Sequence, residues 1–102
     1  MKITVDTVGN TAIIRLGGRF SFDFNREFRG AYDPYLNNDA VESLEIDLSQ
    51  VEYLDSSALG MLLMLRERMQ AANKKLALSK PSATVAQILK IANFSKLFDI
   101  QK

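Results

Sequence analysis

The chain contains no cysteine and no histidine, and these two absences exclude several classes of function. Without cysteine there is no disulfide framework, no thiol nucleophile and no iron–sulfur site. Without histidine there is no Ser–His–Asp triad, and zinc sites of the usual kind lose their main ligands. We therefore expect no metal and no other cofactor.

An excess of charge of one sign is also missing, since 13 basic and 12 acidic residues leave a net charge of +1. This balance gives no electrostatic footprint for nucleic acid or an anionic membrane, and we expect neither as a partner. The longest apolar run, residues 58–65, is far shorter than the about 20 residues that span a bilayer. The beginning, MKITVDTVGN, lacks the apolar segment of a secretion signal. We expect a cytoplasmic protein.

The length of 102 residues fits one small domain without a second core. We therefore expect residues 1–102 to form a single domain. Hydrophobic residues make up 47% of the chain and charged residues 25%, which is typical of a globular protein.

Apolar and polar residues alternate in several short segments, a pattern that predicts β-strands. Gly9-Asn10 separates the first two segments and favours a hairpin, and Gly17-Gly18 is expected to end the second strand. The predicted strands are residues 2–8, 11–16, 43–49 and 75–79.

Helical spacing replaces this alternation between the predicted strands. Phe24, Phe28, Ala31 and Tyr35 follow at i, i+4, i+7 and i+11, which predicts a helix over 22–35 with this face in the core. Ser21, Asp23 and Asn25 are candidate N-caps, and Pro34 should disturb or end the helix. Further helices are predicted over 56–73 and after Ser82, and the final NFSKLFDI is apolar enough to dock on the core.

The predicted order is β-β-α-β-α-β-α with a terminal piece. Two strand–helix–strand crossovers in so short a chain imply an α/β fold, with a mixed β-sheet of about four to five strands and helices packed against it.

The segment LDSSALGMLLML, residues 54–65, places three polar residues before an apolar run. Asp55, Ser56 and Ser57 follow a predicted strand and begin a predicted helix, the place where α/β folds put their sites. Each side chain can cap the first helical turn, but one cap is sufficient. We expect Ser57, or Asp55 in its place, to be the cap, which leaves Ser56 unexplained.

Catalysis by one of these serines is not expected. A serine nucleophile needs a general base, and histidine is absent. Neither Ser56 nor Ser57 begins an S-x-x-K motif, and the chain has no G-x-S-x-G elbow and no glycine-rich phosphate loop. We therefore expect a protein that is not an enzyme.

Phosphorylation is the third interpretation of the serines. A phosphoryl group adds roughly −1.5 to −2 charges, which a helix N-terminus favours by about 0.3–1 kcal/mol per charge. The neighbouring Asp55 opposes this charge, so we expect the fold to survive the modification. A partner that buries the phosphate without pairing it would lose about 2–5 kcal/mol of binding.

The string DLSQVEYLDSSALG, residues 47–60, resembles the signature D-L-S-x-V-x-[FY]-[ML]-D-S-[ST]-[GA]-L-G of STAS-domain anti-sigma factor antagonists. The resemblance extends through the helix to residue 78, and the early GGRF and the late LFDI also lie where that family has similar pieces. It implies a non-enzymatic domain that binds an anti-sigma factor, and so frees a sigma factor to direct transcription.

The resemblance also implies how binding is controlled. Ser56, the first hydroxyl after the motif's aspartate, would be the phosphoacceptor, and Asp55 and Ser57 would flank it. The anti-sigma factor would itself be the serine kinase and a PP2C-type phosphatase would remove the phosphate. In a subgroup that SALGMLLMLR resembles, the partner is a flagellar-type anti-sigma factor, and a separate response regulator supplies kinase and phosphatase.

The surface that would meet the partner is predicted around Ser56. Ala58, Leu62, Leu65 and Met69 form the expected core stripe of the helix, whereas Leu59, Leu63 and Met64 lie off it. Gly60 would allow a neighbouring backbone to approach.

We assign a partner-binding role to Ala58, Leu59 and Leu63, and to Ser21 and Asp23. Ser21 stands where many members of the family carry an acidic residue, so a nucleotide contact at this position is left open. The alternative function is a constitutive STAS scaffold subunit of a transport or signalling complex, which would keep the fold and never be phosphorylated.

Overall fold

Five strands form one sheet whose spatial order follows the sequence. The computed structural model describes residues 2–101. Its strands are β1 (Lys2–Val8), β2 (Thr11–Phe20), β3 (Ser43–Leu54), β4 (Lys75–Ser79) and β5 (Asp99–Gln101). Only β1 is antiparallel to its neighbour, and every pair from β2 to β5 is parallel. The predicted α/β fold with a mixed sheet is confirmed, and the terminal piece supplies its fifth strand.

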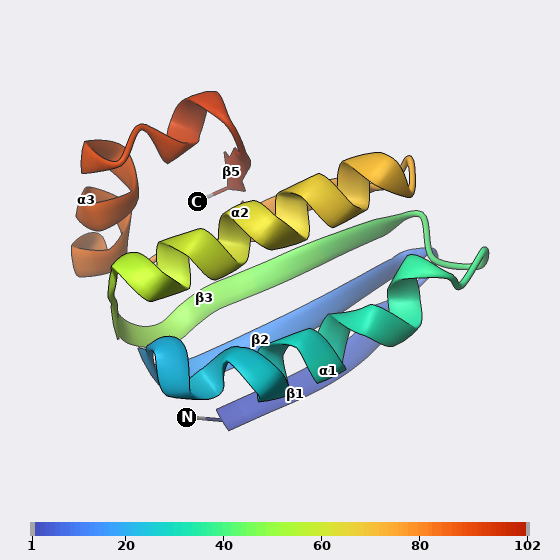
Figure 1. The fold of residues 1–102 in the computed structure, drawn as a ribbon, viewed down its shortest axis with the longest axis horizontal. Helices are drawn as coiled ribbons and strands as arrows, with labels where there is room; N and C mark the ends of the chain where they lie inside the picture. Colours follow the sequence, from blue (N-terminus) through green and yellow to red (C-terminus); the bar gives the residue numbers. More distant parts are fainter. Residues whose placement is uncertain (1, 102) are drawn as a thin grey trace.

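Each parallel connection contains a helix, because a parallel crossover must return the chain to the same end of the sheet. The helices are α1 (Asn25–Leu36), α2 (Ser56–Ala71) and α3 (Ala83–Ile91), with short 3₁₀ turns η1 (Phe22–Phe24) and η2 (Phe94–Lys96). Figure 1 shows α1 and α2 running in the same direction in front of the sheet, while α3 lies at one side. Both long helices therefore begin at the edge where β2 and β3 end.

The core lies between the sheet and the helices. Alternate residues of β2 and β3 point into it, among them Ile14 and Ile46, which are completely buried. The predicted stripe of α2 is confirmed, since all four of its side chains are at most 1% exposed; they are Ala58, Leu62, Leu65 and Met69.

The aromatic face of α1 differs at its last member from the prediction. Phe24 and Phe28 are buried, but the next core residue is Tyr32, which is 1% exposed, whereas Tyr35 is half-buried. Edge-to-face contacts connect this cluster, with ring centroids 5.0 Å apart for Phe20 and Phe28 and 5.2 Å for Phe28 and Tyr32. Phe24 lies in the 3₁₀ turn η1 and α1 begins only at Asn25, so the spacing of a single α-helix does not extend from Phe24 to Tyr35.

Two strands are longer than predicted. β2 continues through Gly17-Gly18 to Phe20, and β3 continues through residues 50–54. Register shifts lie between Arg15 and Gly17 and between Gly18 and Arg19. Gly18 has φ +100°, a conformation that glycine adopts readily. The glycines therefore bend the strand without ending it.

Pro34 lies inside α1 and does not end it. Its missing N–H leaves the carbonyl of Gly30 without the usual partner, and both residues are exposed. Water can therefore satisfy this carbonyl.

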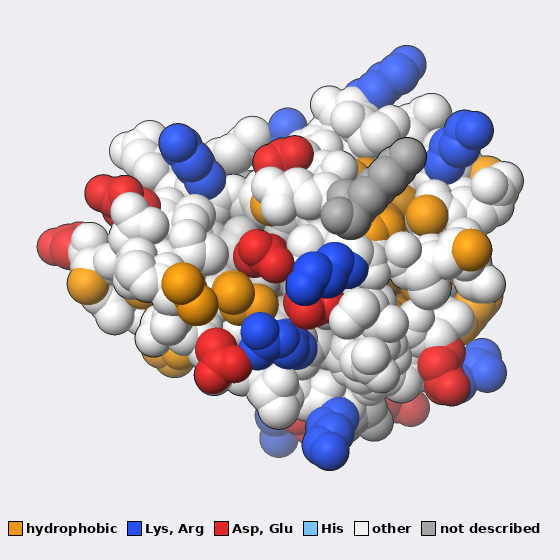
Figure 2. Space-filling view, turned by 180° about the vertical axis from the view of Figure 1, so that it is seen from behind, with side chains coloured by type: hydrophobic (Ala, Val, Ile, Leu, Met, Phe, Trp, Pro, Cys, Tyr) orange, Lys and Arg blue, Asp and Glu red, His pale blue; other side chains and the backbone are white. Residues whose placement is uncertain are grey.

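The sheet face opposite α1 and α2 is polar. Figure 2 shows charged side chains of both signs near its centre. Arg15 pairs there with Asp6 and, at 3.5 Å from Nε to Oδ2, with the buried Asp47. No helix in residues 2–101 is long and apolar enough to cross a bilayer.

Candidate functional site

The candidate site lies at the edge where β2 and β3 end together. Phe20 and Leu54 are register partners in the parallel pair, and the N–H of Asp55 donates to the carbonyl of Phe20 over 3.3 Å. Ser21 follows Phe20 and Ser56 follows Asp55, so both serines lie at the same edge of the sheet. The structure thus brings together two parts of the chain that are 35 positions apart in the sequence.

Asp55 is the N-cap of α2. Its Oδ1 accepts from the N–H of Ala58 at 2.9 Å, and its backbone is extended, with φ −97° and ψ −177°. This is the usual geometry of a cap, in which the carboxylate satisfies one free N–H of the first turn. Of the two predicted caps, Asp55 is therefore the one used and Ser57 is not.

Ser56 is the first residue of α2 and is exposed. Its hydroxyl makes no hydrogen bond to another residue in the described part of the chain. Gly60 and Leu63 follow it at i+4 and i+7, which places all three on the outward face of the helix. Because Asp55 already caps the helix, capping does not explain the serine at position 56.

Large apolar side chains are exposed around Ser56. Leu63 and Met64 of α2 are 36% and 46% exposed, and Phe22 of η1 is 67% exposed. Leu59, one of the predicted partner residues, is half-buried against the core.

The partner role predicted for Ala58 is wrong for its side chain. Ala58 is completely buried, because the position three residues after the cap faces the sheet. The exposure of Phe22 was not predicted, although the segment FDF indicates it. Two phenylalanines two positions apart cannot both face the core from one helix.

Ser21 and Asp23 lie beside this surface without capping a helix. Ser21 precedes η1 with an extended backbone and no capping hydrogen bond from its side chain. Its carbonyl accepts from the N–H of Phe24 at 3.0 Å, which forms the turn. Ser21 is half-buried and Asp23 is exposed. Asn25, the third predicted cap, lies inside α1 as its first residue.

Comparison with known proteins assigns this arrangement to a family. A family model described as "Mlab, STAS domain" matches residues 3–100. The chain belongs to the STAS-domain family. A STAS-domain containing protein of Pseudomonas aeruginosa is 40% identical over 92 residues, which cover 90% of this chain and 89% of that protein.

Solved structures share the fold. A proposed anti-sigma factor antagonist from Thermotoga maritima aligns with a TM-score of 0.87 at 21% identity, over 98% of this chain and 86% of that one. The unphosphorylated anti-sigma factor antagonist SpoIIAA gives 0.82 at 20% identity, over 99% and 89%. SpoIIAA from Bacillus in its phosphorylated form gives 0.75 at 18% identity, over 99% and 92%.

A groove of about 360 Å³ runs between α1 and α2 of this STAS domain, beginning at Ser57. An added Cβ at Gly60 would meet nothing within 4 Å, so no neighbouring backbone approaches Gly60, contrary to the prediction. Gly60 instead borders the open groove, whose lining residues are Phe22, Asn25, Arg29, Ser57, Gly60, Met61, Met64 and Arg68.

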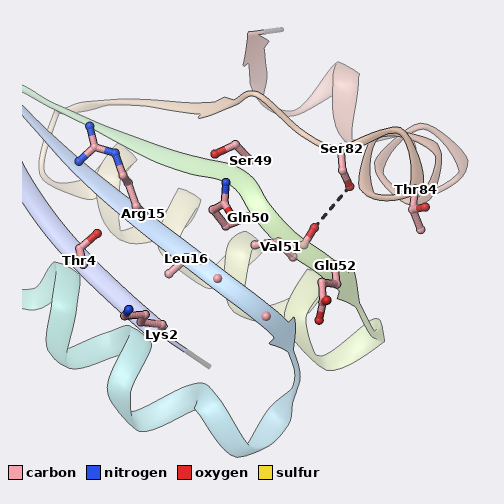
Figure 3. A pocket seen from close by; sticks show the side chains of 12 residues that line it. Lys2, Thr4, Arg15, Leu16, Ser49, Gln50, Val51, Glu52, Ser82 and Thr84 are labelled. Carbon is pink, nitrogen blue, oxygen red and sulfur yellow. Dashed lines mark hydrogen bonds between the residues drawn. The ribbon is translucent and has the colours of Figure 1, made fainter.

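A second hollow, of about 740 Å³, lies on the polar face where β2 and β3 shift register. Figure 3 shows Arg15 and Gln50 at its wall, and a hydrogen bond of 3.4 Å from the Ser82 hydroxyl to the Val51 carbonyl. Ser82 also caps α3 by accepting from the N–H of Val85 at 3.3 Å, as predicted. Arg15 and Ser82 have partners within the fold, and the hollow contains none of the predicted site residues.

Proposed function

We propose that this STAS domain is an anti-sigma factor antagonist of the cytoplasm, and that phosphorylation of Ser56 switches its binding off. The observation that carries the proposal is the division of roles at the start of α2. Asp55 caps the helix, while the hydroxyl of Ser56 is exposed on the same face of α2 as the exposed Leu63. The names of the solved relatives, which include a phosphorylated and an unphosphorylated form of SpoIIAA, support it.

The same geometry explains why phosphorylation would leave the fold intact. A phosphate on Ser56 would lie at the N-terminus of a 16-residue helix, where free N–H groups and the helix dipole favour an anion. The carboxylate of Asp55 repels it, but both effects amount to about 1 kcal/mol at an exposed position.

Binding responds differently, because a partner that covers Ser56 must also cover the phosphate. The exposed Phe22, Leu63 and Met64 would be buried by such a partner, and the phosphate would be desolvated with them. An unpaired charge in an interface costs about 2–5 kcal/mol, which corresponds to about a 30- to 5,000-fold loss of affinity.

The proposed partners follow from this switch. The unmodified domain would bind an anti-sigma factor and so release a sigma factor for transcription. The kinase is either the anti-sigma factor itself or a separate serine kinase, and a PP2C-type phosphatase restores Ser56. Both enzymes can be parts of a response regulator when the anti-sigma factor is of the flagellar type.

Binding of a purified anti-sigma factor tests the switch. The partner is first identified by affinity capture from a native lysate, and its affinity is then measured for wild type, Ser56→Ala and Ser56→Asp. We expect Ser56→Ala to bind like wild type and Ser56→Asp to bind at least about 30-fold more weakly. Thr84→Asp is the matched control, since Thr84 is an exposed hydroxyl in the first turn of α3. Equal affinity of all four proteins would refute the switch.

Intact-mass measurement of the protein from its native cells separates the proposal from the scaffold alternative. We expect a form that carries one phosphate and is lost in Ser56→Ala. Absence of a phosphorylated form under varied growth conditions would favour the alternative, a constitutive subunit of a transport or signalling complex.

A further inference from the structure

Two arginines line the groove between α1 and α2 without a carboxylate partner. Arg29 comes from α1 and Arg68 from α2. Among residues 2–101, the ion pairs within 4.0 Å involve only Arg15, with Asp6 and Asp47. The Nε of Arg68 is buried and has no hydrogen-bond acceptor among residues 2–101. A buried donor without an acceptor is uncommon and destabilises the fold.

Both guanidinium groups affect the pKa of one buried hydroxyl, that of Tyr32. Burial raises the pKa of Tyr32, and the nearby charges of Arg68 and Arg29 act in the opposite direction. Asp33 is the one acidic neighbour that contributes, with an effect between those of the Arg68 and Arg29 charges, and it is exposed on α1 outside the groove. The groove lining in the described chain contains no acidic residue. This end of the groove is therefore positively charged.

The rest of the groove carries large apolar side chains and reaches Ser57, which follows Ser56 in the sequence. Phe22, Met61 and Met64 line it, and Phe22 and Met64 are substantially exposed. Met64 is one helical turn from Arg68 along α2, which is about 5–6 Å. Arg68 lies eleven positions after Ser57, so the groove extends about 16 Å along the helix. Exposed apolar groups beside arginine are typical of protein interfaces.

We propose that this groove binds a partner segment in which an aspartate or glutamate stands beside a large apolar side chain. The carboxylate would accept hydrogen bonds from the guanidinium groups of Arg29 and Arg68, which both line the groove. Guanidinium groups bind carboxylates through parallel hydrogen bonds of this kind. The apolar side chain would cover Phe22 and Met64. We take the partner to be the anti-sigma factor of the proposed function, on which this inference rests.

Selection of peptides from a random library displayed on phage tests the groove without a kinase or a sigma factor. The whole wild-type domain is the bait, and enriched peptides are synthesised for affinity measurements. We expect the enriched peptides to share an acidic residue next to Leu, Ile, Met or an aromatic residue. Their affinity should fall about 10- to 100-fold in Arg29→Gln and in Arg68→Gln, and should weaken with added salt.

Arg26→Gln is the matched control, because Arg26 is an exposed arginine of α1 outside the groove. It removes the same charge and should leave peptide affinity unchanged. Arg68 is partly buried, so Arg68→Gln could unfold the domain. Arg29 is exposed, and Arg29→Gln keeps the test decisive in that case.

The inference is overturned if no peptide is enriched, if the enriched peptides lack acidic residues, or if Arg26→Gln weakens binding as much as Arg29→Gln. These outcomes leave the role of Ser56 intact, because that role is tested by partner binding of the Ser56 variants. Conversely, peptides that depend on both arginines support the groove even if Ser56→Asp binds the anti-sigma factor normally.

Discussion

Replacement of Asp55 by alanine should destabilise the domain, whereas replacement of Ser57 should not. Asp55→Ala removes the oxygen that accepts from the N–H of Ala58 at 2.9 Å. Ala58 is completely buried, so water replaces this acceptor poorly. Loss of an N-cap costs about 0.5–2 kcal/mol, and we expect a value in the upper half of that range. Because 1 kcal/mol corresponds to about 4–8 °C in a domain of this size, the melting temperature should fall by about 5–16 °C.

Urea unfolding followed by circular dichroism measures the effect. Asp55→Asn keeps a capping oxygen and should retain most of the stability, while Ser57→Ala should remain within about 0.5 kcal/mol of wild type. The assignment of the cap is refuted if Ser57→Ala is as destabilising as Asp55→Ala. It is also refuted if Asp55→Ala has the midpoint of wild type.

Three further changes test the packing. Leu62→Ala should lower the free energy of unfolding in urea by about 2–5 kcal/mol, because Leu62 is completely buried. Leu63→Ala should lower it by less than about 1 kcal/mol, because Leu63 is 36% exposed. Equal effects of the two variants would contradict the orientation of α2. Gly30→Ala should raise the free energy of unfolding by about 1 kcal/mol, since an added Cβ meets nothing within 4 Å and alanine favours a helix; a lower melting temperature would contradict the open space beside Gly30. Burial raises the pKa of Tyr32 above 10.0. The free energy of unfolding should therefore be highest below about pH 10 and decrease as the pH rises through the folded-state pKa of Tyr32. Urea unfolding at pH 9 to 11 should show a smaller decrease for Tyr32→Phe than for wild type.

Alternation and helical spacing were sufficient to predict the architecture because they reflect which side chains face the core. β4 begins and ends where predicted, and the four-residue stripe of α2 is buried. The ends of β2 and β3 were not predictable in this way. Beyond Gly17 and Ser49 the strands bend at register shifts, and the bulges interrupt the period of two on which the prediction depends.

The site was predictable only as far as it is local in the sequence. Asp55, Ser56 and Ser57 are consecutive, so their place at the start of a helix followed from neighbouring residues. Phe22 and Arg29 reach the same surface only because β2 and β3 are parallel neighbours and α1 lies beside α2. That proximity is a property of the topology, and no short-range pattern contains it.

The capping geometry also determines how stability and binding are coupled. If Ser56 were the cap, its phosphorylation would remove a hydrogen bond of the first turn, and modification would change the fold and the affinity together. Because Asp55 accepts that bond and Ser56 is exposed, the two properties can vary independently. Ser56→Asp should therefore change the melting temperature by less than about 4 °C while it weakens partner binding by at least about 30-fold. Asp55→Ala should lower the melting temperature while the hydroxyl of Ser56 stays available to a kinase. A domain in which both variants lose stability to the same extent would not be a switch of this kind.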